Sequence, residues 1–523
     1  MKFKIQTFAK KEYLIYFFFS FCFIALNFAT LSSLLPWCDE VMFMDPPVNY
    51  IKYGSWSTTA WYGADDVSAF SLYPPLFQWC EVCWFKIWGG VSLYSARSLN
   101  FILILLIGFL MLSFTRKELL NNQSFNSLSV ILFTIFLWGT KEFGWMYRNG
   151  RPDILGLLFC LLTLRSIWNY IKYNRRIAKL LSSVYAGLAL MSGIQTAVFL
   201  IAFLLFTILF FKEKRKQIYK VAIFVLGGMT IGMLICIAFF LNMGYLKPFI
   251  GNIVSMSATM KQLFELIRPY LEGPLHLKPA AEHEITNVAG DSPSFLSRLS
   301  DSFEYISYII LLSVNIVILF VRRKEITCPW IRNNVIVLTI FSLFIIVFMN
   351  LAGRFAIYYR WMIYLPIVLS VLIVLNQERK FRKTEYTLYS ITTIILMALG
   401  IQSFNTDTGL SKKVDDIDIN EFHQMMKSAD IPQDSHIAGP FFSFYELKNN
   451  YTHCYFPQVY PTKFIKKLDY LVVYGENRYK KGFPLYGQAS VINYLRELQN
   501  RNDVKLELVK EDKKNDIRLY HIR

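Results

Sequence analysis

Asp39 and Glu40 are adjacent carboxylates that follow closely on an uncharged apolar stretch, Tyr13–Leu35. A helix of about 20 apolar residues crosses a bilayer, so the two acids should stand at a membrane surface. Charged groups are costly there unless they bind something or do chemistry. A carboxylate in this position could take the proton from a hydroxyl group during a group transfer. By themselves, the two residues could equally be the solvated start of a loop.

Arginines that could bind phosphate are the second chemical feature of the chain. Arg148, Arg151 and Asp153 lie together between two apolar runs, and Arg354 and Arg360 flank an aromatic run. The planar fork of arginine donates two parallel hydrogen bonds to a phosphate. The alternative for Arg151 and Asp153 is a structural ion pair across a helix start, where proline and aspartate are favoured.

The composition defines the elements that must position these residues. The chain has 523 residues, of which 54% are hydrophobic and 17% aromatic, and its mean hydropathy is +0.36. These values fit a multi-span α-helical membrane protein. The net charge of +18 does not indicate nucleic acid, because the lysines and arginines cluster in short loops, as the positive-inside rule predicts.

Apolar runs predict about eleven membrane spans. The N-terminus is predicted to be cytoplasmic, because every strongly basic loop then falls on one side. The aromatic stretch Pro74–Trp88 is expected to form a helix in the membrane interface, since a crossing there would invert all later loops. The predicted spans are about Tyr13–Leu35, Leu93–Phe114, Leu128–Tyr147, Ile154–Tyr170, Ala178–Met191, Thr196–Phe211, Val221–Leu241, Phe303–Phe320, Asn334–Asn350, Tyr358–Leu375 and Tyr386–Ile401.

This scheme divides the chain into a transmembrane domain, residues 1–402, and a C-terminal domain, residues 403–523. Residues 36–91 form a polar first outer loop and residues 242–299 a long second one. The C-terminal domain should lie outside the cell and have a small α/β fold, because short strand and helix patterns alternate in it. The predicted strands are Ser435–Ala438, Leu468–Val473, Val504–Leu508 and Ile517–Ile522, and the predicted helices are Phe441–Lys448 and Ser490–Leu498.

Several segments together resemble the GT-C superfamily of integral-membrane glycosyltransferases. The chain is most similar to the dolichyl-phosphate-mannose protein mannosyltransferase-like group, which includes the bacterial lipid A aminoarabinose transferase. The resemblance rests on the order and spacing of four segments. They are the acidic segment Asp39–Phe43 with Tyr50 and Gly54–Trp56, the Pro-Pro-Leu segment Tyr73–Trp79 with Phe85–Gly89 and Ala96-Arg97, the segment Arg148 to Asp153, and the segment Tyr359-Arg360 with Tyr364–Pro366.

The resemblance implies a catalytic site and a donor substrate. Asp39 would be the general base, with Glu40 beside it. The donor would be a polyprenyl-phosphate sugar, with its phosphate held by residues of the kind seen at Tyr73, Arg148, Arg151, Asp153, Arg354 and Arg360. The sugar would pass with inversion to a hydroxyl acceptor on a glycolipid, polysaccharide or protein.

The resemblance implies no cofactor or resident metal, although a divalent cation stays open. It also favours a multi-pass protein of the bacterial inner membrane, with the lipid bilayer and no nucleic acid as partner. Two other classes stay open as alternatives. One is a transporter or flippase of lipid-linked sugars, and the other is a non-catalytic membrane assembly protein.

Overall fold

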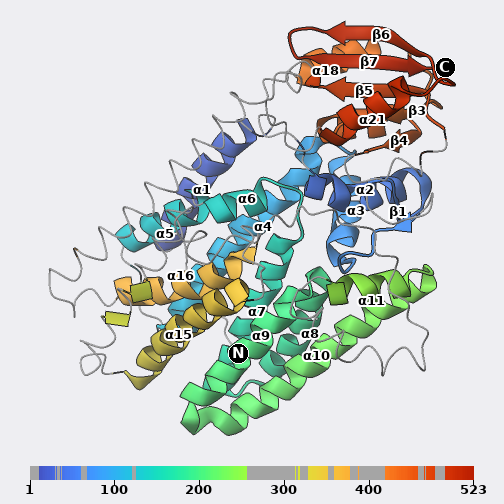
Figure 1. Ribbon diagram of the computed structural model, residues 1–523. Helices are drawn as coiled ribbons and strands as arrows, with labels where there is room; N and C mark the ends of the chain where they lie inside the picture. The colour runs from blue at the N-terminus through green and yellow to red at the C-terminus, as the bar shows by residue number, and fades with distance from the viewer. Residues whose placement is uncertain are drawn as a thin grey trace.

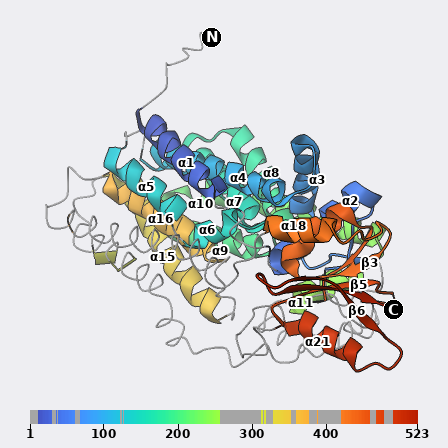
Figure 2. The ribbon, with the colours of Figure 1, turned by 90° about the horizontal axis from the view of Figure 1, so that it is seen from above.

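The computed structural model describes residues 11–29, 38–60, 68–120, 127–139, 141–255, 328–351, 359–376, 419–457, 467–476 and 489–523, with a few single positions between them. Long helices make up most of the described chain. A β-sheet from the C-terminal residues lies at one end of the helical part (Figures 1 and 2). It stands beside the helices of residues 38–53 and 76–88, which are labelled α2 and α3.

The helical part is apolar enough to sit in a membrane. Among the described residues, five helices have the length and hydropathy of a membrane span, and three shorter apolar helices accompany them. This is consistent with an integral membrane protein. The helices of this part are α1 (Lys11–Ala29), α4 (Leu93–Phe114), α5 (Ser127–Gly139), α6 (Lys141–Tyr147), α7 (Asp153–Tyr173), α8 (Arg176–Ser192), α9 (Gln195–Phe210), α10 (Arg215–Asn242), α11 (Leu246–Ser255), α15 (Pro329–Leu351) and α16 (Trp361–Leu375).

Most of the predicted spans coincide with these helices. The second predicted span has the same bounds as α4, which begins at a capping box formed by Ser92 and Ser95. The third predicted span, Leu128–Tyr147, corresponds to α5 and α6, and Thr140 between them lies outside the described residues. The predicted spans Phe303–Phe320 and Tyr386–Ile401 lie almost wholly outside the described residues, so the number eleven stays a prediction.

The segment predicted as a polar first loop contains two helices. Asp39 and Glu40 lie in the first turn of α2 (Cys38–Tyr53). The positive end of the helix dipole stabilises carboxylates at that position. The prediction missed α2 because Pro46 and Pro47 stand inside it, and proline normally disrupts a helix interior. A short antiparallel pair follows, β1 (Ser57–Thr58) with β2 (Ser68–Ala69).

Helix α3 (Leu76–Trp88) confirms the helix predicted in the aromatic stretch. It ends at Gly89, whose φ of 85° is in the left-handed region that glycine adopts without strain. Its buried face packs against α2, α4 and α8.

Helices α8 and α10 cross closely because glycines remove side chains from their contact. A Cβ atom on Gly187 would lie 2.7 Å from the carbonyl oxygen of Gly228, and one on Gly232 would lie 2.6 Å from that of Gly187. A Cβ atom on Gly228 would collide with the carbonyl oxygen of Ser183. Small residues spaced four apart allow this kind of backbone approach between membrane helices.

The C-terminal unit, residues 419–523, is built around a mixed sheet. The described residues form five strands in the order β4-β3-β5-β7-β6, where β3 is parallel to β4 and β5, and β7 is antiparallel to β5 and β6. The predicted strands are present, whereas β4 and α18 were missed. The elements are α18 (Ile419–Lys427), β3 (His436–Ala438), α19 (Phe444–Asn450), β4 (His453–Tyr455), β5 (Tyr470–Tyr474), α21 (Ala489–Gln499), β6 (Leu506–Asp512) and β7 (Ile517–Ile522).

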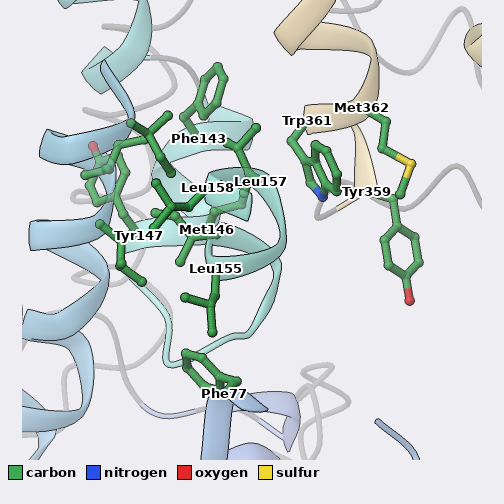
Figure 3. Close-up of a cluster of buried hydrophobic side chains, with 14 of the residues drawn as sticks. Phe77, Phe143, Met146, Tyr147, Leu155, Leu157, Leu158, Tyr359, Trp361 and Met362 are labelled. Atoms are coloured by element: carbon green, nitrogen blue, oxygen red, sulfur yellow. The ribbon is translucent and has the colours of Figure 1, made fainter. Parts of the chain in front are cut away.

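A hydrophobic cluster joins the helical elements next to the candidate site. Figure 3 shows Met146 and Tyr147 from the end of α6 near Leu155 from α7, with Phe77 from α3 beyond them. Trp361 at the start of α16 is fully buried. This cluster fixes the ends of several helices that carry the polar residues described next.

Candidate active site

Asp39, Arg151 and Asp153 form one connected ion network. Arg151 donates from Nη1 to the Asp39 carboxylate and from Nε to Oδ2 of Asp153 at 2.9 Å. The Arg151 side chain is 1% exposed and that of Asp153 0%, whereas that of Asp39 is 20% exposed. Asp39 is therefore the member of the network that a second molecule could reach.

Glu40 points into a different network from its neighbour. Arg97 on α4 donates from Nε and Nη2 to the two carboxylate oxygens of Glu40, at 2.8 and 2.6 Å. Its Nη1 donates to the carbonyl oxygen of Leu31 at 2.9 Å. Both side chains of the pair are fully buried. This two-point geometry makes Glu40 an anchor for the start of α2.

Asn100, one helical turn beyond Arg97 on α4, supports the segment that carries Arg151. Its Nδ2 lies 2.6 Å from the carbonyl oxygen of Asn149 and 3.3 Å from those of Met146 and Arg151. Residues three apart share a helix face, so one face of α4 anchors both segments that carry the Asp39–Arg151 ion pair, one through Glu40 and the other through backbone carbonyl oxygens.

Arg97 and Asn100 carry a signal in the sequence, because both polar side chains stand near the start of an apolar span. Arg97 was predicted only as part of the family pattern, and Asn100 was not predicted. Polar side chains inside an apolar span are costly and mark function by default.

Tyr73 lies near the ion network of Asp39 and Arg151, in contact with Tyr359 and Phe43. Its hydroxyl lies 2.6 Å from that of Tyr359, which directly precedes Arg360. The ring of Tyr73 packs edge to face with Phe43 of α2, at 4.9 Å between centroids. The Arg151 guanidinium lies 5.3 Å from the centroid of Phe43. Burial raises the pKa of Tyr73 well above its usual value, so its phenol is neutral.

The remaining predicted arginines have different positions. Arg148 is buried in the turn between α6 and α7. Gly150 lets this turn approach α2, since a Cβ there would lie 2.5 Å from Cε and 3.3 Å from Cγ of Met44. Arg360 is half-buried and precedes α16 directly, while Arg354 lies outside the described residues.

A further acidic residue, Glu81 on α3, was not a candidate from the sequence. It is fully buried, and neither of its carboxylate oxygens has a hydrogen-bond partner among the described residues. Burial, and secondly the charge of Glu40, raises the pKa of Glu81 well above its usual value. The neutral acid is the form that this environment favours.

Within the described residues, no three His, Cys, Asp or Glu side chains gather in a way that could hold a metal ion.

Residues 73–241 match the family model described as dolichyl-phosphate-mannose-protein mannosyltransferase. Solved structures with similar folds include ArnT from Cupriavidus metallidurans bound to undecaprenyl phosphate. That match has 9% identity and a TM-score of 0.56, and covers 96% of this chain and 97% of the other. The apo oligosaccharyltransferase of Archaeoglobus fulgidus matches with 12% identity and a TM-score of 0.55, covering 92% of this chain and 71% of the other. No curated protein sequence matches this chain.

The fold is therefore similar to that of membrane glycosyltransferases of the GT-C superfamily. Within it, the family model and the structural matches confirm the predicted resemblance to the group of protein mannosyltransferases and ArnT.

Proposed function

We propose that this chain transfers a sugar from a polyprenyl-phosphate donor to a hydroxyl acceptor. The family model and the fold support the class of enzyme. The donor class is supported by the similar ArnT structure, which contains undecaprenyl phosphate. The acceptor is proposed to be a glycolipid, polysaccharide or protein.

The observation that carries the proposal is the placement of Asp39. Its carboxylate is 20% exposed, while Arg151, which pairs with it, and Asp153, which holds Arg151, are buried. A general base must come within hydrogen-bond reach of the proton that it removes. A rigidly held carboxylate at the exposed end of a buried network fits that requirement.

The proposed reaction is a single displacement with inversion. The acceptor oxygen attacks the anomeric carbon on the side opposite to the phosphate, and its proton passes to Asp39. The bond from the anomeric carbon to the phosphate oxygen breaks as the new bond forms. The electron pair leaves with polyprenyl phosphate, whose negative charge increases by one as it departs.

Positive groups near Asp39 are proposed to stabilise the departing phosphate. Arg148 lies in the same turn as Arg151, and Arg360 follows Tyr359, which contacts Tyr73. Charge that develops in the transition state is stabilised best by donors already in place. Arg354 is proposed from the sequence alone to join them.

We further propose that this site faces away from the cytoplasm. The basic clusters Lys212–Lys216 and Arg322–Lys324 support that orientation by the positive-inside rule. A reporter fused after Arg523 should then read as external, and one inserted at Lys214 as cytoplasmic. A cytoplasmic C-terminus would overturn the orientation.

Transfer by the purified protein tests the function against its alternatives. The protein is incubated in detergent with a polyprenyl-phosphate sugar labelled in the sugar and with candidate acceptors. An enzyme releases polyprenyl phosphate and labels an acceptor. A flippase would move the intact donor across a liposome membrane, and an assembly protein would leave the donor unchanged.

A further inference from the structure

Helix α19 of the C-terminal unit contacts α2 through a buried ion pair. Nζ of Lys448 lies 2.6 Å from Oδ1 of Asp45, and the two side chains are 4% and 0% exposed. The same ammonium donates to Oδ1 of Asn49, one turn further along α2, at 2.9 Å. Thr58 and the backbone NH of Thr59 donate to Oδ2 of Asp45 at 2.9 and 2.7 Å. Both carboxylate oxygens of Asp45 therefore have polar partners.

A second residue of α19 reaches the start of α2. The hydroxyl of Tyr445 donates to Oε1 of Glu40 at 3.3 Å. Burial, and secondly the charge of Glu40, raises the pKa of Tyr445 well above its usual value, so the phenol keeps its proton. Tyr445 and Lys448 are three residues apart and share one face of α19.

Further hydrogen bonds extend this contact to either side. Tyr53 at the end of α2 donates to the carbonyl oxygen of Thr452 at 3.0 Å. Thr59 donates to the carbonyl oxygen of Cys454 at 2.6 Å, and Asn449 donates to that of Val91 at 3.0 Å. The C-terminal unit therefore touches α2 along most of its length.

Helix α2 depends on such external support. Two consecutive prolines, Pro46 and Pro47, lie inside it and remove two backbone donors, which destabilises a helix interior. Ion pairs that hold its side chains compensate for that weakness. The pair between Asp45 and Lys448 stands directly before the prolines, and Asp39 stands one to two turns ahead of it.

We propose that α19 is a positioning element for the catalytic base, in which Lys448 and Tyr445 hold α2 so that Asp39 stays aligned with the acceptor. This inference rests on the function proposed above. It gives the C-terminal unit a part in catalysis although neither residue is placed at the reacting atoms. A misplacement of about 1 Å can reduce a rate by about a hundredfold.

The kinetic test compares Lys448→Met with Asn450→Ala. Asn450 is on the same helix, and its side chain bonds to Glu446 within that helix, so its variant should transfer normally. Lys448→Met should lower kcat by about ten- to a hundredfold and leave the donor KM within about twofold, because the donor arginines are not on α2. Lys448→Arg should recover part of kcat.

Tyr445→Phe keeps the test decisive if Lys448→Met folds poorly, and a double variant extends the test where Lys448→Met folds. Tyr445→Phe removes a single hydroxyl and should lower kcat several-fold with the melting temperature nearly unchanged. The double variant Asp45→Asn with Lys448→Met should lose less than the product of the two single losses, because each single change breaks the same pair. Losses that simply multiply, or a Lys448→Met variant with wild-type kcat, would overturn the proposal.

Hydrogen exchange separates this inference from the function on which it rests. Residues 38–53 should exchange faster in Lys448→Met than in wild type, while residues 215–242 of α10 should not change. If wild type forms no product, the proposed function fails, but faster exchange in α2 still supports the contact. Unchanged exchange in α2 would overturn the positioning role whatever the activity.

Discussion

Breaking the ion pair of Arg97 and Glu40 should destabilise this protein strongly. Both side chains are fully buried and their shortest N–O distance is 2.6 Å. Removing one partner of a buried pair leaves an uncompensated charge and costs about 3–5 kcal/mol. Arg97→Met should therefore destabilise the protein by that amount, which is a factor of about a hundred or more in the folded population.

An exposed pair of equal length is the matched control. Arg501 and Asp503 lie 2.6 Å apart, but their side chains are 56% and 69% exposed. Arg501→Met should leave the melting temperature unchanged, because water and salt already screen that pair.

Thermal unfolding of the purified variants in detergent measures the difference. The double variant Arg97→Met with Glu40→Met should melt higher than either single variant, since no buried charge then lacks its partner. The reasoning is refuted if Arg97→Met and Arg501→Met melt at the same temperature.

Three other predictions concern packing, protonation and the donor site. Gly228→Ala should disrupt the contact of α10 with α8 and lower the melting temperature, whereas Gly227→Ala should not, because a Cβ there has nothing within 4 Å; equal melting of the two contradicts the packing. Because burial raises the pKa of Glu81, the contribution of this residue to stability should be fully present below a pH of about 4 and be lost as pH rises through the raised value. Glu81→Gln should therefore melt above wild type at pH 8 and converge with it in acid, and a difference independent of pH would count against this. Arg148→Ala and Arg360→Ala should each reduce transfer about ten- to a hundredfold, since a hydrogen bond to a charged group contributes about 1.5–3 kcal/mol, with poor rescue by lysine; normal transfer by both places the phosphate elsewhere.

The helices were predictable from the sequence where apolar runs are long. Helix α4 has a serine cap, a long apolar run and no internal charge after Arg97 until the basic pair that follows it. Those local signals define its bounds completely. Helix α2 could not be predicted in this way, because its prolines and acids resemble a loop and its partners lie on other elements.

The candidate site shows the same division. Asp39, Arg151 and Asp153 could be named from residue type and position, and the structure brings them into one network. The pairing of Glu40 with Arg97 could not be predicted. Adjacent residues on a helix point about 100° apart, and Arg97 is 57 residues away in the sequence. Contacts of α19 with α2 are more distant still in sequence, and no local pattern reports them.

Transfer by Asp39→Asn tests the central claim most directly. The substitution keeps the shape of the side chain and removes its ability to accept a proton. General base catalysis contributes typically 10²–10⁴-fold, so transfer from the labelled polyprenyl-phosphate sugar should fall to about a hundredth of wild type or less, with the melting temperature preserved. A folded Asp39→Asn protein that keeps clearly more than about a hundredth of wild-type turnover would contradict the assignment of Asp39 as the general base.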